Sequence, residues 1–295
     1  MPYRFPDAPF CRFCECIAGR LQWFPLVEEE HAVALLNPRQ RMSGATLIAP
    51  RRHVHAFSEL TAIEARAILD LALAMSERLQ SALTVDGIHV FCNSGVAAGQ
   101  SEPHAHVQVI PRYADQPYTF VSSRTLEIAR PDDLTALSKK LMNPVRSPPT
   151  RLAAAREMRP SECRVCREIQ DASCVVLDAA DYFVAIVPER CRARGSAVIA
   201  SRRCIPGPDS LTGDEQVELV KLIQSTAKAI ERTYDPDGLN IWWDLGAIAG
   251  QIDFHYCVEL VPRFDNVPYK YTSLLEIPTM PTAIREKIAH ELRGG

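Results

Sequence analysis

The sequence contains no long hydrophobic run and no strong excess of charge of either sign. None of its apolar stretches approaches the roughly 20 residues that span a bilayer, and the opening MPYRFP lacks the unbroken apolar core of a signal peptide. The 33 Lys and Arg residues nearly balance 36 Asp and Glu residues, and the net charge of −3 is too close to zero for the positive field that non-specific nucleic-acid binding needs. We therefore expect a cytoplasmic protein with a small-molecule ligand, and neither a membrane nor a nucleic acid as partner.

The composition is that of an ordinary globular chain. With 295 residues, 47% hydrophobic and 23% charged, it excludes disorder and collagen-like repeats, and its length favours two domains. Its ten cysteines are unsuited to structural disulfides in a reducing cytoplasm, which leaves metal ligation or burial as their expected use. Two C-x-x-C pairs stand out, Cys11 with Cys14 and Cys163 with Cys166.

The second half of the sequence repeats the first at an offset of 151 residues. Between residues 87–112 and 238–263, 9 of the 26 aligned pairs are identical, far more than unrelated segments share. The two C-x-x-C pairs repeat at an offset of 152. We interpret the chain as a duplication, with domains at 1–145 and 161–295 and a linker at 146–160. A Pro- and Ser-rich stretch over 143–149 joins the copies and supports this linker.

Each copy has the pattern of an α+β domain. In the first copy, Thr61 and Glu64 form a capping box that predicts a helix from about 61 to 83, and Thr212 and Glu215 repeat it. Apolar and alternating segments predict strands near 31–37, 45–49, 87–93 and 104–110. We therefore expect, in each half, an antiparallel sheet of about five strands with one long helix.

The segment 104–110 alternates polar and apolar residues. As a strand it would direct His104, His106 and Gln108 to one face. The nearby turns add small polar side chains and backbone amides suited to anionic oxygens, among them Asn93, Gln100 and Ser101. This combination predicts a phosphate site in which the central imidazole of His106 could act as nucleophile and form a phosphoramidate. The competing interpretation is a surface strand histidine without a role.

These segments resemble the histidine triad (HIT) superfamily, whose motif is His-φ-His-φ-His-φ-φ, with φ an apolar residue. Gln108 replaces the third His, which is similar to the branch containing galactose-1-phosphate uridylyltransferase and the dinucleoside tetraphosphate phosphorylases. The resemblance covers nearly all of the first half, including the blocks at 11–14, 34–37, 44–50 and 101–112. It implies a nucleotide hydrolase or nucleotidyltransferase that cleaves a nucleoside phosphoanhydride or phosphodiester through a nucleotidyl-histidine, with a nucleotide or dinucleotide as substrate.

The resemblance also implies roles for individual residues. His106 would attack the α-phosphorus while the main-chain carbonyl of His104 orients its ring. Gln108, Gln100 and Ser101 would hold phosphoryl oxygens. Asn37 stands where the family contacts the nucleoside ribose, although a turn residue before a proline is the alternative interpretation for it.

A zinc site is a further implication of the resemblance. In bacterial members zinc often joins the C-x-x-C pair, a later His and the first His of the triad, and here those positions are Cys11, Cys14, His53 and His104. The matching positions in the second half are Cys163, Cys166, Cys204 and His255. Two thiolates with two imidazoles suit tetrahedral Zn²⁺, and four protein ligands leave no place for substrate, so each site would be structural. A redox pair or reduced core cysteines are the alternatives. A redox pair would not need Cys204 at the place of His53, whereas zinc accepts either ligand.

The second half lacks the residues that the first half uses for chemistry. The positions of His106, Gln108, Ser101 and Asn37 hold Cys257, Glu259, Ile252 and Pro188, and only Gln251 is retained. A carboxylate would repel phosphate, and a buried role is expected for Cys257. We expect Trp242 and Trp243 to pack against the core or the other half, and His55, which has no counterpart, to be a surface residue.

The duplication therefore predicts a fused pair in which one half is degenerate. The second half would serve as scaffold and pocket wall, with Tyr269 to Tyr271 as candidate wall elements, and the chain could act as a monomer because the pseudo-dimer is intramolecular. A catalytically silent, zinc-containing nucleotide-binding or interaction module is the main alternative. A zinc-ribbon-like nucleic-acid binder is disfavoured because Glu28-Glu29-Glu30, rather than basic and aromatic residues, follows the first cysteines.

Overall fold

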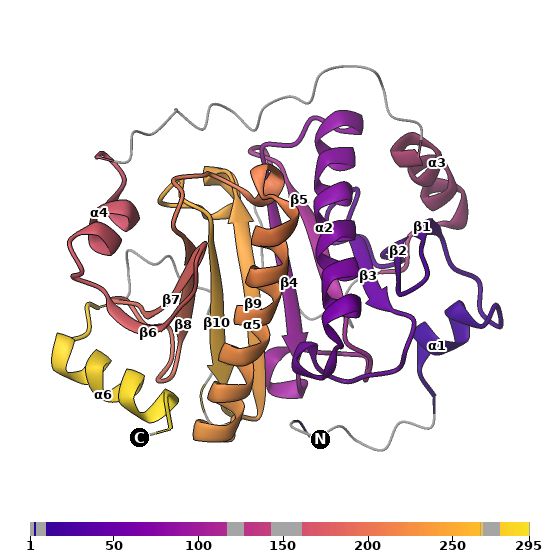
Figure 1. Ribbon diagram of the computed structural model, residues 1–295. Coiled ribbons are helices and arrows are strands. Elements are labelled where there is room, and N and C mark those ends of the chain that lie inside the picture. The colour runs from indigo at the N-terminus through magenta and orange to yellow at the C-terminus, as the bar shows by residue number, and fades with distance from the viewer. Residues whose placement is uncertain are drawn as a thin grey trace.

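The computed structural model describes Tyr3 and residues 10–116, 127–142, 161–265, 267 and 278–294. Figure 1 shows one broad sheet with two long helices lying side by side across one of its faces. The predicted linker at 146–160 and the predicted wall elements Tyr269 to Tyr271 lie outside the described residues, so both stay predictions.

The two halves contain the same elements in the same order. The first half contains α1 (Arg12–Ile17), β1 (Pro25–Glu28), β2 (Ala32–Leu36), β3 (Thr46–Pro50), the 3₁₀ turn η1 (Phe57–Glu59), α2 (Ala62–Ala82), β4 (Gly87–Ser94), η2 (Val96–Ala98), β5 (Val107–Arg112) and α3 (Pro131–Met142). The second contains α4 (Arg164–Gln170), β6 (Val175–Ala179), β7 (Phe183–Val187), β8 (Ala197–Ser201), η4 (Pro208–Ser210), α5 (Gly213–Tyr234), β9 (Gly238–Leu245), η5 (Ala247–Ala249), β10 (Cys257–Arg263) and α6 (Thr282–Leu292).

The ten strands form a single antiparallel sheet. Its order is β1-β2-β3-β5-β4-β9-β10-β8-β7-β6, so β4 and β9 join two five-stranded halves at the centre. Phe91 lies directly opposite Trp242 in that pairing, and these two residues are equivalent at the 151-residue offset. A local twofold axis therefore passes between them. The predicted α+β class, the five-stranded halves and the intramolecular pseudo-dimer are confirmed.

Local sequence explains why the long helices begin where they do. The capping boxes of Thr61 with Glu64 and of Thr212 with Glu215 are both present, each with the hydroxyl accepting from the Glu N–H and the carboxylate accepting from the Thr N–H. Apolar residues of α2 and α5 then pack on one face of the sheet and form the main core with alternate strand residues such as Val90, Val107 and Val109.

A second, smaller cluster covers the junction on the opposite face of the sheet. It consists of Met42, Ala45, Phe91, Ile110, Trp242 and Val261, so it draws residues from both halves. Trp243 instead joins the helix-side core. Trp242 thus packs against residues of the first half, and Trp243 packs in the core, as expected.

Two glycines allow the halves to approach closely at the junction. A Cβ at Gly87, the first residue of β4, would lie 2.8 Å from the backbone nitrogen of Ala249 in η5. A Cβ at Gly238, the first residue of β9, would lie 2.6 Å from the backbone nitrogen of Ala98 in η2. Since both distances are shorter than real Cβ contacts, each central strand needs glycine where the other half's 3₁₀ turn packs against it.

One row of side chains crosses eight strands on the face opposite α2 and α5. Directly opposed residues of antiparallel strands share a face, and the strand register places these in one line: Leu35, Leu47, Gln108, Phe91, Trp242, Glu259, Val198 and Ile186. The second four match the first four at the 151-residue offset, in mirror order about the axis. We call this line the cross-sheet row.

The predicted strand at 104–110 begins later than expected. β5 starts at Val107, and His104 and His106 lie in the irregular segment before it. The amide of Ala105 donates to the carbonyl of Val54 at 2.7 Å instead of to a strand ladder, and the neighbouring β3 ends at Pro50, which has no N–H to extend the pairing. The helix and the other three predicted strands lie within two residues of their predicted ends, whereas β1 had not been located from the sequence.

Within the described ranges, no helix combines the length and the apolar character that crossing a bilayer would require.

Candidate functional site

His106 is held as an oriented, neutral imidazole. It is 6% exposed, and its Nδ1–H donates to the main-chain carbonyl of His104 at 2.8 Å, the contact expected from the sequence. Because the carbonyl can only accept, Nδ1 carries the proton and Nε2 keeps its lone pair. Burial lowers the pKa of His106, although the hydrogen bond to His104 opposes this effect. The arrangement leaves the Nε2 lone pair of His106 available as a possible nucleophile.

Gln108 follows His106 by two residues and lies on the same face of the sheet. Its neighbours Val107 and Val109 belong to the helix-side core, so Gln108 points to the opposite face, as part of the cross-sheet row. Its side chain is 7% exposed, and its Oε1 has no hydrogen-bond partner among the described residues. A buried amide group with an open hydrogen bond is typical of a site completed by a ligand or water.

Gln100 is used differently from the expectation. Its Oε1 accepts from the Gly95 N–H at 2.7 Å, and its Nε2 donates to the carbonyls of His55 at 2.9 Å and His104 at 3.2 Å. The side chain therefore fixes three backbone segments, including the carbonyl that orients His106. These contacts favour a positioning role for Gln100 over direct contact with a phosphoryl group.

The remaining predicted contact residues, Asn93, Asn37 and Ser101, lie in three different segments of the first half. Asn93 on β4 is buried, and its Oδ1 accepts from Nδ2 of Asn240 at 2.7 Å, so it serves the junction. Asn37 follows β2, and its Oδ1 accepts from the Arg39 N–H at 2.9 Å, which fits the turn interpretation for that atom. Ser101 is half-buried in the turn after η2. Their roles toward a nucleotide stay predictions.

Phe13 is a site residue that the sequence patterns did not single out. Its ring centroid lies 5.0 Å from that of His106 and 5.2 Å from that of His104, and it packs with apolar residues of β2 and β3. Since Phe13 lies inside the C-x-x-C segment, α1 places an aromatic ring beside His106 and also carries the thiol of Cys14. An apolar residue between two cysteines gave no sequence signal for this contact.

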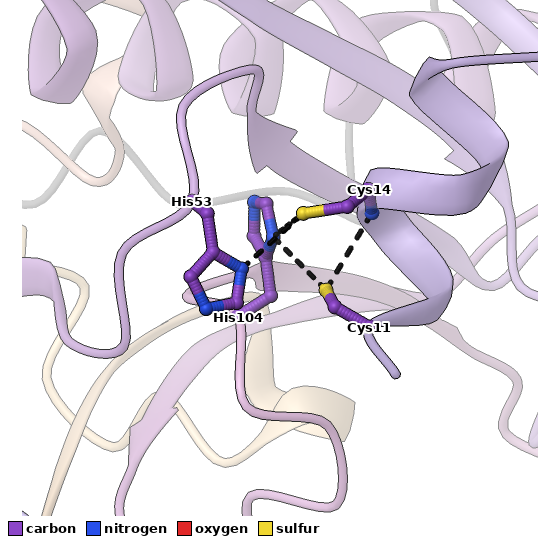
Figure 2. A group of neighbouring side chains, drawn as sticks. All are labelled: Cys11, Cys14, His53 and His104. Atoms are coloured by element: carbon purple, nitrogen blue, oxygen red, sulfur yellow. Dashed lines mark hydrogen bonds between the residues drawn. The ribbon is translucent and has the colours of Figure 1, made fainter. Parts of the chain in front are cut away.

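The first group of predicted metal ligands converges in the structure. Figure 2 shows Cys11, Cys14, His53 and His104 pointing toward one another. Nδ1 of His104 lies 3.4 Å from Sγ of Cys11 and 3.6 Å from Sγ of Cys14, and Nδ1 of His53 lies 3.2 Å from Sγ of Cys14. A tetrahedral ion about 2.3 Å from sulfur and about 2.05 Å from nitrogen would separate such atoms by roughly 3.6 Å. The donor set and its spacing therefore fit a metal ion.

The tautomer of His104 also suits metal binding. Its Nε2–H donates to the carbonyl of Pro50 at 2.9 Å, so the Nδ1 lone pair faces the sulfurs. Burial is the largest cause that lowers the pKa of His104, to about 4, and burial raises the pKa of Cys11 to about 12. His104 thus turns its ring to this cluster and only its carbonyl to His106, which corrects the expectation of two imidazoles on one surface.

The second group of predicted ligands repeats this geometry. Nδ1 of His255 lies 3.3 Å from Sγ of Cys163 and 3.5 Å from Sγ of Cys166, and its Nε2–H donates to the carbonyl of Ser201 at 2.6 Å. Cys204 completes the group, whose ligand atoms all lie within 4.8 Å of one another. Both groups could hold a metal ion.

Ion pairs around the two clusters were missed by the sequence patterns. Arg52, beside His53, donates to both carboxylate oxygens of Glu64 at 2.8 and 2.7 Å, and Arg203, beside Cys204, repeats the contact to Glu215 at 2.6 and 2.8 Å. The pairs Arg12 with Glu102 at 3.6 Å and Arg164 with Asp253 at 2.6 Å link the cysteine helices to the turns before His104 and His255. The repeat offset itself was the signal that could have found them.

Known proteins match the first half of the chain. The family model of the HIT domain covers residues 22–115. An uncharacterized HIT-like protein of Mycoplasma genitalium is 32% identical over 103 residues, which represent 35% of this chain and 73% of that relative. The chain belongs to the HIT family.

The tandem arrangement has solved counterparts as well. A GalT-like protein from Arabidopsis thaliana has a TM-score of 0.65 and 17% identity, over 96% of this HIT chain and 90% of that chain. An ADP-glucose phosphorylase from Arabidopsis thaliana, solved with bound ADP-glucose, has a TM-score of 0.63 and 18% identity, over 99% of this chain and 92% of that chain. At these identities the likeness shows the fold alone, here across both HIT-like halves.

The second HIT-like half keeps the framework and replaces the residues that are predicted to carry the chemistry. Glu259 occupies the place of Gln108 and pairs with Arg192 at 2.9 Å, and burial raises its pKa while Arg192 opposes that shift. Cys257, half-buried, occupies the place of His106. Gln251 repeats the bracing of Gln100: its Oε1 accepts from the Gly246 N–H at 2.9 Å and its Nε2 donates to the carbonyl of Pro206 at 2.6 Å. The one retained amide is therefore explained by loop structure.

His55 differs from the sequence expectation. It is half-buried instead of exposed, its ring packs edge-on against that of His53 with 4.9 Å between centroids, and its carbonyl accepts from Gln100. The hydrogen bond to Gln100 could not be identified from residue type, because the His55 backbone makes it.

Proposed function

We propose that this HIT protein is a nucleotide hydrolase or nucleotidyltransferase that cleaves a nucleoside phosphoanhydride or phosphodiester through a nucleotidyl intermediate on His106. The observation that carries the proposal is the Nδ1–H bond of His106 to the His104 carbonyl at 2.8 Å, which leaves Nε2 as the nucleophilic atom. Gln108 on the same face of the sheet keeps an Oε1 without a partner among the described residues, an acceptor that a donor group of a ligand or water would satisfy, while its Nε2 can donate to phosphoryl oxygens.

The proposed reaction has two displacements. Nε2 of His106 attacks the α-phosphorus, a P–N bond forms, and the bond from phosphorus to the leaving-group oxygen breaks with its electron pair going to that oxygen. Water or a phosphorylated acceptor then attacks the same phosphorus, its proton leaves to solvent, and the P–N bond breaks to restore the imidazole. The His104 carbonyl holds Nδ1–H in both steps, and Gln108 and Ser101 would hydrogen-bond phosphoryl oxygens.

Gln108 limits which leaving groups can depart. A carboxamide can hydrogen-bond but has no proton to release near neutral pH, whereas a histidine at that position could protonate an amine or alkoxide. The leaving group must therefore be stable as an anion, as phosphate, pyrophosphate, a nucleotide or a sugar phosphate is. We expect phosphoanhydride substrates to react faster than nucleoside phosphoramidates.

We also propose that each Cys/His cluster holds one Zn²⁺. Cys11, Cys14, His53 and His104 would hold the first ion, and Cys163, Cys166, Cys204 and His255 the second. When bound, zinc would supply structural cross-linking, because four protein ligands leave no open position. The first cluster would fix α1, and with it Phe13, beside His106.

The reaction is tested by incubating the protein with dinucleoside polyphosphates and nucleotide sugars, with and without inorganic phosphate, and identifying products by phosphorus NMR. ADP-glucose belongs in the panel because a structural neighbour of the whole chain is named as its phosphorylase. Cleavage with trapping of an α-labelled nucleotide on His106 is expected. A protein that binds these nucleotides and turns over none of them would support the silent binding module instead.

A further inference from the structure

The second HIT-like half contains a cavity at the place that corresponds to the proposed catalytic site. Its volume is about 300 Å³, at the low end of the roughly 300–1,000 Å³ typical of small-molecule sites. All four residues of the cross-sheet row from this half line it: Ile186, Val198, Glu259 and Trp242. The volume suits one nucleoside-sized molecule and is small for a dinucleotide.

The apolar end of this cavity is retained from the first half. Val165, Ile186 and Val198 line it and pack together around the C-x-x-C helix α4. They match Phe13, Leu35 and Leu47, which pack together beside His106. Each half therefore has a wall of three apolar side chains that could contact a flat ring. The wall lies beside His106 in the first half and beside Cys257 in the second. The smaller Val165 leaves more space than the Phe13 ring does.

The polar end of the cavity has the wrong charge for phosphate. Its lining includes the carboxylates of Glu168, Glu189, Asp244, Asp253 and Glu259 but only two cationic side chains, those of Arg164 and Arg190. Glu259 is paired with Arg192, and Arg164 is shared between Glu168 and Asp253, so the five carboxylates exceed the three guanidinium groups of Arg164, Arg190 and Arg192. Asp244 contacts His89 of the first half. A phosphate dianion would add charge of the same sign as this excess, whereas hydroxyl groups could donate to the carboxylates.

We infer that the second-half cavity is a binding site for an unphosphorylated nucleoside, with the base against Val165, Ile186 and Val198 and the ribose hydroxyls toward the carboxylates. The choice of a nucleoside rests on the proposed function, because it assumes that the equivalent wall of the first half holds a nucleotide. The site is separate from the nucleophile and would bind the dephosphorylated relative of the substrate. Its ligand would contact Asp244, which reaches the first half through its pairing with His89.

Tryptophan fluorescence offers a direct test. The chain has three tryptophans, and in a Trp23→Phe variant the two that remain, Trp242 and Trp243, both line the cavity. We expect quenching on titration with at least one of adenosine, guanosine, cytidine and uridine. The matching 5′-monophosphate should quench with an affinity lower by about tenfold or more. No response to any of the four nucleosides, or equal affinity for the monophosphate, would overturn the inference.

A matched pair of variants locates the effect. Val198→Phe narrows the second-half cavity, and Leu47→Phe makes the same change at the equivalent first-half position. Nucleoside quenching should disappear with Val198→Phe and persist with Leu47→Phe. The reverse pattern would assign the nucleoside to the first half. Should Val198→Phe fold poorly, as judged by circular dichroism, Ile186→Phe replaces it. Failure of the proposed function would appear separately, as absence of turnover in a protein that still binds nucleosides.

Discussion

The two HIT-like halves share one sheet and one set of structural contacts but differ around residues 106 and 257. Both retain a four-residue Cys/His cluster, a capping box with an arginine partner, an ion pair to the cysteine helix and a bracing glutamine. Only the first retains His106, Gln108, Ser101 and Asn37. What both halves keep is framework, so the comparison separates framework residues from the residues proposed to be reactive.

This comparison bears on the metal clusters and on Gln100. If the metal ligands served only the reaction, the second half, with Cys257 and Glu259, would not need them. Ligands that hold a helix to the sheet would be needed in both halves. In the same way, a glutamine kept for phosphate should have changed with its neighbours, yet Gln251 is retained and braces its loop. The differences between the halves support a structural role for both features.

The largest expected difference between the halves concerns the nucleophile. His106→Ala should lower turnover by about 10³-fold or more while leaving the fold and nucleotide binding largely intact. The measurements are steady-state rates and trapping of an acid-labile, base-stable adduct from an α-labelled substrate. His290→Ala, at an exposed position in α6, is the control and should retain full activity. An adduct that persists in His106→Ala would contradict the assignment.

The metal clusters should respond equally in the two halves. Protein purified without added zinc should carry about two equivalents, and Cys204→Ala should carry about one and unfold at lower temperature, because structural zinc contributes to folding. Cys11→Ala should have the same effect in the first half and additionally reduce turnover, since α1 carries Phe13. Cys174→Ser, a half-buried cysteine outside both clusters, is the control. A zinc content near zero would contradict the metal sites and support the interpretation as reduced core cysteines.

The glutamine pair tests positioning against phosphate binding. Gln100→Glu can still accept from Gly95 but places a carboxylate against the carbonyls of His55 and His104, so kcat should fall by about 10- to 100-fold with little change in KM. Gln251→Glu makes the same change in the second half. Both variants should lower the free energy of unfolding by roughly 1–3 kcal/mol, but Gln251→Glu should not lower kcat. A large rise in KM for Gln100→Glu, with no loss of stability in either variant, would restore the phosphate role.

The smallest expected effect is a pH dependence of the folding stability, which both halves should show equally. Arg52 and Arg203 lower the pKa values of Glu64 and Glu215, each to about 2. A depressed carboxylate pKa stabilises the fold above the unfolded value of about 4.5, and this stabilisation is lost as pH falls toward 2. Glu64→Gln and Glu215→Gln should each cost about 1 kcal/mol at neutral pH, because the half-exposed arginines are screened by solvent.

The check for the carboxylates is urea unfolding between pH 7 and pH 3. The difference from the parent protein should stay constant down to about pH 4.5 and then shrink. Glu77→Gln, at an exposed position on α2, should show no such difference. Unequal losses in the two halves would mean that the arginine pairs do not serve the same purpose in both.

Much of the framework could be predicted from the sequence because duplication showed each signal twice. Capping boxes located both long helices, and the replacement of His53 by Cys204 pointed to two clusters whose members the structure brings together. The oriented ring of His106 was also anticipated. The capping boxes depend on residue type and local spacing, which the sequence states directly, whereas the ligand sets and the orientation of His106 were implied by the resemblance to the HIT family.

Other features depend on long-range packing and were not accessible. Pro50 ends β3, so the chain before Val107 leaves the sheet and His104 turns to the metal cluster, which the alternating pattern could not indicate. The contacts of Gln100 are made to backbone atoms of residues that carry no motif. The cavity of the second half likewise depends on side-chain volumes summed over five elements.

The central β4–β9 pairing of the fused chain is no longer symmetric. In a symmetric dimer of first halves, Phe91 would face its own copy, and His89 would stand opposite Asn93 on both sides. In the fused chain Phe91 faces Trp242, His89 meets Asp244 on one side of the axis and Asn93 meets Asn240 on the other. Each half is therefore complementary to its partner and no longer to itself. A first half expressed alone would pair its β4 with a second copy without the His89–Asp244 contact, so cutting the chain would not reproduce the junction that the fused chain has.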